Sequence, residues 1–241
     1  MKYKQGYEPD LRKRILRSFS RVIATLFRIN GESEFGNIFL QVVNPIIKIN
    51  NPLDPRRILK FRSGHERLHW RITKTSDLEE ETNSWINTFE RGEIFLDVGS
   101  NIGMFSLLAA QARGVNCISF ELDPLNVALQ HENIFLNDLH GLILLVPIPL
   151  SERTSRKAVC YKSISPGDAL HSLDLPSPMI SETNREGVRY STQVTMTLDD
   201  LYQQFELPQA DYLKLDVDGT ELNILRGASR TLRTIKSLMC E

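Results

Sequence analysis

Residues 94–103 read IFLDVGSNIG, an apolar run that ends in an acid and is followed by two glycines four positions apart. The run 94–98 has the length of a buried strand, 99–103 has the composition of a turn, and the MFSLLAAQA that follows predicts a helix. In parallel sheets, ligands bind at the carboxyl ends of the strands, and the first strand-to-helix turn is their usual cradle. The stretch therefore predicts an α/β fold and a candidate binding site within it.

Comparison with nucleotide-binding loops narrows the ligand. Dinucleotide loops follow G-x-G-x-x-G, but Asn101 and Met104 occupy the places of the second and third glycines. A Walker A loop needs a lysine near its end, and this turn has none. The pattern that fits is D-x-G-x-x-x-G, in which Asp97 offers a carboxylate to an ammonium group and N–H groups at the helix N-terminus face a carboxylate. Such a pair suits an amino-acid zwitterion, and asparagine at position 101 tolerates the left-handed conformation.

The next strand adds a second half to this ligand. NCISFE ends in Glu121, 22 residues after Gly99, where an acid is placed to accept hydrogen bonds from ribose hydroxyls. Asp123 and Pro124 predict the N-cap and first residue of the following helix. An amino acid joined to a ribose is S-adenosylmethionine, the predicted cofactor. The alternative is that the glycines merely form a tight turn and the acids are surface side chains.

Apolar runs of strand length recur at 94–98, 116–120, 142–148 and 212–217, separated by helical segments. Strands that alternate with helices favour a mostly parallel sheet with helices on both faces. Because crossovers between parallel strands are right-handed, the predicted core is Rossmann-like.

Composition excludes several classes of protein. The chain has 241 residues, 41% hydrophobic and 24% charged, which predicts a soluble globular protein of one or two domains. No apolar run has transmembrane length and the start lacks a signal-peptide core, so a cytoplasmic location is expected. Three scattered cysteines favour neither disulfides nor a metal site. The net charge of -1 argues against general nucleic-acid binding.

The first 75 residues are predicted to form an accessory region, with the cofactor-binding domain at 76–241. Residues 11–29 predict a basic amphipathic helix, which either packs on the core or contacts an anionic membrane surface or an acidic substrate. Residues 44–56 carry three prolines and three asparagines and predict a connector. The alternation of Leu68, Trp70 and Ile72 after Ser63-Gly64 predicts a hairpin, and Asp77 is a candidate cap for a helix that follows.

Several motifs together resemble the FkbM-type methyltransferases: FLDVGSNIG, ISFELDP followed by N-x-x-x-N, TLDDL at 197–201, and DYLKLDVDGTELNILRGA at 211–228. The resemblance covers about 85–241. It implies a class I, S-adenosylmethionine-dependent methyltransferase fold, usually acting on hydroxyl groups of sugars, polyketides or other small metabolites. By position it assigns the turn to the methionine end of the cofactor and Glu121 with Asp123 to the ribose. The predicted cofactor-binding residues are Asp97, Gly99, Ser100, Asn101, Gly103, Glu121, Leu122 and Asp123.

The chain departs from the family pattern at three places. Asp218 stands where the family usually has glutamate, which shortens the side chain by one methylene. Pro147 and Pro149 lie where adenine is expected to rest. SLMCE at the end predicts a fifth strand, whereas class I methyltransferases normally add two more, so the last strands are expected to be missing and an edge exposed.

Methyl transfer needs the acceptor oxygen to be held against the methyl carbon, and a hydroxyl acceptor also benefits from a general base. Asp216 and Asp218, at the end of the fourth strand, are the predicted catalytic residues. They are alternatively placed to orient the cofactor amine or to bind the substrate through Lys214 or water. Glu221 is as compatible with a charge at a helix N-terminus as with a ligand. His171 lies in a predicted substrate loop, 163–187, where a lone histidine is more often a bystander.

HERLH at 65–69 matches H-E-x-x-H, in which two histidines one helical turn apart bind zinc and the glutamate activates water. Gly64 and the strand-like alternation argue against the helix that this zinc hydrolase site requires, and no metal is predicted. A methyltransferase fold that binds its cofactor without turnover is the other alternative. The prediction is an S-adenosylmethionine-dependent methyltransferase, O-directed, with a small-molecule or glycan acceptor.

Overall fold

The computed structural model describes residues 18, 19, 22, 45–64, 66–161, 165–169, 171–173 and 189–240. The chain divides into two compact units, Met1–Pro45 and Ile46–Glu241. Most of the predicted basic helix at 11–29 lies outside the described residues; Ser18, Phe19 and Val22 are helical. Among the described residues, no helix has both the length and the apolar character needed to cross a membrane.

The larger unit is built on a five-stranded parallel sheet in the order β10-β9-β3-β4-β5. Its strands are β3 (Ile94–Val98), β4 (Asn116–Phe120), β5 (Ile143–Val146), β9 (Tyr212–Leu215) and β10 (Ser237–Cys240). The first two have the predicted bounds, and the predicted fifth strand is the edge strand β10. The α/β, Rossmann-like prediction is therefore confirmed.

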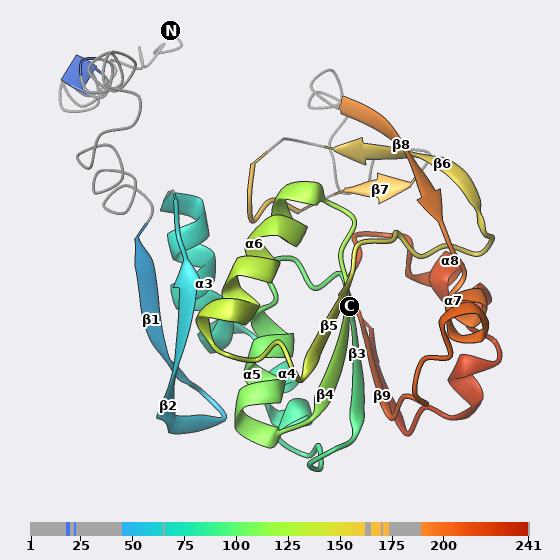
Figure 1. The fold of residues 1–241 in the computed structure, drawn as a ribbon, viewed down its shortest axis with the longest axis horizontal. Coiled ribbons are helices and arrows are strands. Elements are labelled where there is room, and N and C mark those ends of the chain that lie inside the picture. The colour runs from blue at the N-terminus through green and yellow to red at the C-terminus, as the bar shows by residue number, and fades with distance from the viewer. Residues whose placement is uncertain are drawn as a thin grey trace, which may run out of the picture. The chain divides into compact units, whose positions relative to one another are not determined.

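Helices cover both faces of this sheet (Figure 1). Figure 1 shows α5 (Met104–Arg113) and α6 (Pro124–Leu136) on one side, and α7 (Leu198–Phe205) and α8 (Glu221–Arg226) on the other. Neighbouring strand residues point to opposite faces of the sheet. Phe95 therefore packs in the core under α5 and α6, and Leu96 packs in the core under α7 and α8. A short 3-10 turn, η2 (Thr231–Arg233), leads to β10.

An antiparallel hairpin precedes the parallel sheet in the chain: β1 (Ile46–Asn51) and β2 (Asp54–Arg62). The prediction of a connector at 44–56 with a hairpin after it was therefore wrong, because the hairpin begins within the predicted connector. The prolines of the segment lie before β1, in the turn and near the start of β2, while Leu59 and Phe61 alternate into the core. The hairpin belongs to the same compact unit as the sheet.

The segment predicted to complete a hairpin is instead the helix α3 (Glu66–Leu78). Leu68 and Ile72 are buried one helical turn apart, while Trp70 between them is 55% exposed. The apparent alternation was therefore two members of a helical stripe with an exposed aromatic between them. Helix α4 (Glu80–Ile86) follows, and its N-cap is Glu79 rather than Asp77, which lies within α3.

Asparagine and glutamine side chains attach the hairpin to the helices beside it. Asn137 Oδ1 accepts from the Lys60 N–H at 2.8 Å, and its Nδ2 donates to the Lys60 carbonyl at 2.7 Å. Asn133 Oδ1 accepts from the Arg62 N–H at 2.8 Å, and Gln111 Nε2 donates to the Ile58 carbonyl at 3.0 Å. The N-x-x-x-N motif, Asn133 and Asn137, therefore serves to join α6 to β2.

A second, antiparallel sheet lies above the carboxyl ends of the parallel strands (Figure 1). It has the order β7-β6-β8, from β6 (Ser155–Tyr161), β7 (Ser172–Leu173) and β8 (Arg189–Thr195). The sequence did not predict this sheet, and β7 falls within the segment predicted to be a loop.

Candidate active site at the carboxyl ends of the strands

A cavity of about 270 Å³ opens where β3, β4 and β9 end. Its wall is formed by residues of the turn after β3 (the cofactor turn), by residues after β5, by residues just before β7, and by residues of α3 and of the junction between α3 and α4. Among the described residues of the wall, acidic side chains outnumber basic ones: the acids are Glu79, Glu121, Asp168, Asp216 and Asp218, and the basic side chains are Arg71 and His171. A cavity of this charge suits a cationic ligand.

The turn after β3 has the backbone conformation that its sequence predicts. Gly99 has φ +83°, and a Cβ there would lie 1.8 Å from the Asp216 carbonyl oxygen, so only glycine fits. Asn101 has φ +51°, the left-handed conformation expected of it. Gly103 has φ +84°, and a Cβ would lie 2.7 Å from Gln130 Cγ. Gly99 and Asn101 line the cavity, whereas Ser100 and Gly103 support it from behind.

The N–H groups of this turn were expected to face a carboxylate of the ligand, but each of them already donates to an acceptor within the protein. Gly99 and Ser100 both donate to the Phe120 carbonyl at 3.0 Å, and Gly103 donates to the Ser100 carbonyl at 2.8 Å. Asn101 N–H donates to Glu121 Oε2 at 2.8 Å, and Ile102 N–H to Asn101 Oδ1 at 3.0 Å. The amides thus hold the turn in shape rather than stand open to a carboxylate.

Asp97 is fully buried and does not line the cavity. Its Oδ2 accepts from the Ser106 N–H at 3.1 Å and from Ser106 Oγ at 2.5 Å, which fixes the first turn of α5. Burial raises the pKa of this carboxyl, while Lys214 and Ser106 act in the opposite direction. Asp97 Oδ1 has no hydrogen-bond partner among the described residues. The structure places this predicted cofactor residue one layer below the site.

Glu121 lies in the cavity wall as predicted, beside Leu122. Its Oε1 accepts from the N–H groups of Leu122 and Asp123, both at 2.8 Å, and its Oε2 accepts from Asn101. Three of about four acceptor positions are thereby used, which leaves room for a hydroxyl donor. Burial raises the pKa of Glu121 to about 7, although the backbone hydrogen bonds oppose this.

Asp123 caps α6, as predicted: its Oδ1 accepts from the Leu125 N–H at 2.7 Å and the Asn126 N–H at 3.3 Å. Its Oδ2 lies 3.1 Å from His171 Nε2, with both side chains buried. Burial raises the pKa of Asp123, but the contact with His171 and the cap hydrogen bonds outweigh it and hold that pKa below its usual value. The structure thus brings His171 from its distant segment to the cavity.

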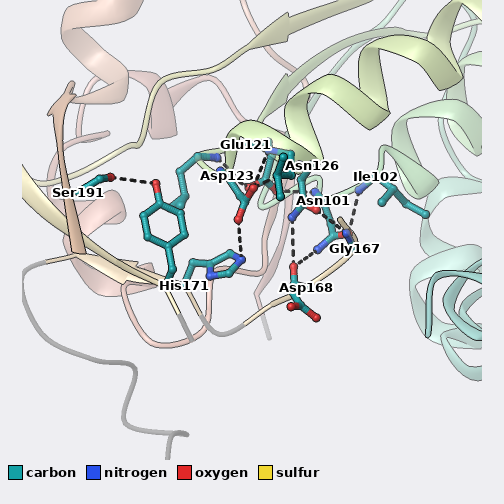
Figure 2. A network of polar contacts seen from close by, with 12 residues as sticks. Asn101, Ile102, Glu121, Asp123, Asn126, Gly167, Asp168, His171 and Ser191 are labelled. Carbon is teal, nitrogen blue, oxygen red and sulfur yellow. Dashed lines mark hydrogen bonds and ion pairs between the residues drawn. The ribbon is translucent and has the colours of Figure 1, made fainter. Parts of the chain in front are cut away.

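The segment before His171 is fastened to the cofactor turn (Figure 2). The side-chain amides of Asn101 and Asn126 both donate to the Asp168 carbonyl, at 2.8 and 3.1 Å. Asn126 Oδ1 in turn accepts from the Gly167 N–H at 2.6 Å. The turn and the start of α6 therefore form one connected polar network with Gly167, Asp168 and His171, which the sequence did not predict.

Asp216 lies in the cavity wall at the end of β9. Lys214 Nζ, 1% exposed, lies 2.7 Å from Asp216 Oδ2 and 4.9 Å from the centre of the Phe105 ring. Burial lowers the pKa of Lys214, but Asp216 and Asp97 outweigh it and hold that pKa above its usual value. A buried cation therefore fixes one carboxylate oxygen of Asp216, and Oδ1 has no partner among the described residues.

Asp218 also lines the cavity, with φ +57°. Aspartate is among the residues that tolerate this conformation best, which is consistent with its presence in place of glutamate. Glu221 lies outside the cavity wall. Its Oε1 accepts from the N–H groups of Val217 and Gly219 at 3.3 and 3.0 Å, so it supports the turn that carries Asp218.

The HERLH segment is helical from Glu66 onward, so the argument from strand-like alternation was wrong. His65 lies outside the described residues, and His69 is exposed. No cluster of three potential metal-ligating side chains occurs in the described parts of the chain. The helix alone therefore adds no support for a zinc site.

The cavity fits S-adenosylmethionine in two polar respects. Its net acidic wall matches a sulfonium and an ammonium group, and Glu121 keeps an acceptor position for a ribose hydroxyl. Apolar residues that follow β4 and β5 provide a surface for a base: Leu122, Ile148, Pro149 and Leu150.

Comparison with known proteins agrees with this geometry. A sequence profile described as the methyltransferase FkbM domain matches residues 97–241. A curated relative, the hexuronic acid methyltransferase AglP of Haloferax volcanii, is 25% identical over 177 residues, which cover 71% of this chain and 65% of the relative. The chain thus spans 65% of the length of that relative.

Two solved methyltransferase structures share partial similarity with the chain. A precorrin-6y C5,15-methyltransferase from Geobacter metallireducens superposes with a TM-score of 0.42 and 11% identity, covering 70% of this chain and 64% of that chain. An S-adenosylmethionine-dependent methyltransferase from Thiobacillus denitrificans, in complex with S-adenosyl-L-homocysteine, gives a TM-score of 0.29 and 17% identity, covering 36% and 38%.

Proposed function

Because the chain belongs to the FkbM family of methyltransferases, we propose that it methylates a hydroxyl group of a sugar or another small metabolite. S-Adenosylmethionine is the cofactor. The observation that carries the proposal is the cavity at the strand ends, which joins the family's glycine turn, Glu121 and Asp216 in one wall.

The residues of the cavity divide into a cofactor side and an acceptor side. Gly99 and Asn101 are proposed to hold the methionine end, and Glu121 with Leu122 the adenosine. Ser100 and Gly103 act through the shape of the turn, Asp97 through the first turn of α5, and Asp123 through α6. The predicted set thus separates into residues that contact the cofactor and residues that position them.

When bound, S-adenosylmethionine supplies an electrophilic methyl group on a sulfonium. Asp216 Oδ1 would accept the proton of the acceptor hydroxyl when that hydroxyl receives the methyl group. Lys214 supports this role because it occupies Oδ2 and holds the carboxylate in one orientation. General-base assistance of this kind typically contributes about 10²–10⁴-fold in rate.

A sugar is the acceptor class that the chemistry of the wall favours. Asp216, Asp218 and Glu79 present carboxylates, which are good acceptors for several hydroxyl groups of one ligand. Arg71 adds a guanidinium that suits a carboxylate, as in a uronic acid. The name of the relative AglP, a hexuronic acid methyltransferase, supports the same class.

The first test is calorimetric titration of the full chain with S-adenosylmethionine and S-adenosylhomocysteine. We expect micromolar binding that is lost in Glu121→Ala and retained in Glu90→Gln, an exposed acid outside the cavity. A folded chain that binds neither compound would overturn the proposal.

The second test measures formation of S-adenosylhomocysteine with a panel of sugars, including glucuronic acid and glucose as a matched acidic and neutral pair. Asp216→Asn is expected to lower kcat about 10²-fold or more, a larger effect than its effect on cofactor affinity. Cofactor binding without turnover on any acceptor would favour the non-catalytic binding module. Methylation of an amine instead of a hydroxyl would refute the assignment of the acceptor.

A further inference from the structure

His171 is a buried polar side chain that the family motifs do not assign. Its side chain is 6% exposed, and it lines the same cavity as Glu121 and Asp216. Neither ring nitrogen makes a hydrogen bond of good geometry among the described residues, but Nε2 lies beside the Asp123 carboxylate, whereas Nδ1 has no such neighbour. A buried polar atom without a partner costs free energy, so its presence in a cavity wall points to a ligand that completes it.

The other ring nitrogen, Nε2, lies next to a carboxylate. Nε2 lies 3.1 Å from Asp123 Oδ2, and the Tyr161 ring lies 5.2 Å from the imidazole, centre to centre. Asp123 cannot readily turn away because its Oδ1 caps α6. When Nε2 carries the proton toward Asp123, Nδ1 is the acceptor, which selects a ligand with an N–H or O–H donor.

The position of His171 relative to the sheet indicates which half of the cofactor it meets. Its partner Asp123 follows directly after Glu121 and Leu122 at the end of β4, the adenosine side. Asp216 follows β9, and β3 lies between β4 and β9. Two strand spacings, about 10 Å, therefore separate the two sides. His171 belongs with the adenosine and not with the acceptor.

We propose that His171 contacts the adenosine half of the cofactor, with Nδ1 accepting a hydrogen bond from a ribose hydroxyl or from the adenine amine. The inference rests on the proposed function. It makes Asp123 a positioning residue for His171 as well as a helix cap. It also gives Gly167 and Asp168 a role: their hydrogen bonds with Asn126 and Asn101 hold the chain close to His171 against the turn after β3 (Figure 2).

The test compares His171→Ala and His171→Asn with the wild type in calorimetric titrations of S-adenosylhomocysteine and 5′-methylthioadenosine, which lacks the amino-acid end. We expect His171→Ala to weaken both ligands by about the same factor, roughly tenfold, because one hydrogen bond to the shared nucleoside is lost. His171→Asn, which keeps a polar group close to Nδ1, recovers most of the affinity. His140→Ala, at a surface histidine outside the cavity wall, serves as the control.

Each outcome separates this inference from the function on which it rests. Absence of binding by a folded wild-type chain refutes the proposed function. Wild-type affinity in His171→Ala, or a loss for S-adenosylhomocysteine that spares methylthioadenosine, refutes the adenosine contact alone. If His171→Ala had a lower melting temperature but bound both ligands with wild-type affinity at temperatures where it is folded, His171 would be only structural, and the inference would also be overturned.

Discussion

Glu121 makes the affinity for the cofactor depend on pH. Burial raises its pKa to about 7, from an ordinary value of 4.5. A ribose hydroxyl is accepted best by the ionised carboxylate, so below pH 7 binding must first remove a proton. Between pH 8 and pH 6 the ionised fraction falls about tenfold, and the dissociation constant is expected to rise by roughly the same factor.

The same group affects folding with the opposite sign from an ion-paired acid. Between pH 4.5 and 7 the folded state keeps a proton that the unfolded chain has released, so stability falls as the pH rises through this range. The difference corresponds to roughly 3 kcal/mol. Glu121→Gln, which stays neutral, is therefore expected to be more stable than the wild type at pH 8 and to differ little at pH 5.

Calorimetry in two buffers of different ionisation enthalpy measures both the affinity and the proton count. We expect the wild type to release close to one proton on binding S-adenosylhomocysteine at pH 6 and almost none at pH 8. Glu121→Gln should bind weakly with no slope between these values, whereas Glu90→Gln should keep the wild-type slope. A wild-type affinity that is flat from pH 6 to 8, or a slope that survives in Glu121→Gln, would refute the reasoning.

Three further perturbations follow from the packing. Gly99→Ala places a methyl group 1.8 Å from the Asp216 carbonyl at a positive φ, so chemical denaturation should show a loss of at least about 3 kcal/mol, against almost none for Gly141→Ala, where the added Cβ meets nothing within 4 Å. Lys214→Met leaves Asp97 and Asp216 without their buried cation and should cost about 3–5 kcal/mol in the same assay, partly recovered by adding Asp216→Asn; an unchanged midpoint would contradict the pairing. Asp199→Ala removes the acceptor for the N–H groups of Arg230 and Thr231 and should cost about 2–3 kcal/mol. Burial raises the pKa of Asp199, but these hydrogen bonds outweigh it and hold that pKa below 3.8. The carboxylate should therefore stabilise the fold above this pH and lose that effect as the pH falls further. If Asp199→Ala destabilised the protein equally at pH 7 and pH 2.5, the pairing would be contradicted.

The strands β3 and β4 could be predicted from sequence because each is a short apolar run with an acid or glycine directly after it. The cofactor turn followed from the same stretch, including the left-handed Asn101. The part that failed was the hairpin. Three prolines and three asparagines in 44–56 signal a loop locally, but packing of Leu59 and Phe61 against the helices overrides that signal.

The network around His171 could not be predicted because it depends on contacts between distant residues. Gly167 meets Asn126 across 41 positions, and no local pattern marks either residue. The same holds for Arg71 and Glu79, which precede the family motifs and reach the cavity only through the elbow between α3 and α4. Periodicity and spacing identify residues on one element, whereas the wall of this cavity is drawn from many.

Other motifs that carry the family resemblance have structural roles outside the cavity. Thr197 caps α7, with its hydroxyl accepting from the Asp200 N–H at 2.9 Å. A Cβ at Gly227 would lie 2.3 Å from the Ser151 carbonyl, so the glycine allows two segments to meet. These residues make the family recognisable in sequence without touching the cavity.

The side-chain amides that grip β2 have a consequence for solubility. A two-stranded hairpin has two free margins, and an unpaired row of backbone groups invites another chain to add a strand. Along β2, alternate residues 58, 60 and 62 give these groups to Gln111, Asn137 and Asn133. These side chains therefore occupy backbone groups that a third strand would otherwise pair with. They protect this edge from the addition of a strand from another molecule, and so from aggregation, without extending the sheet.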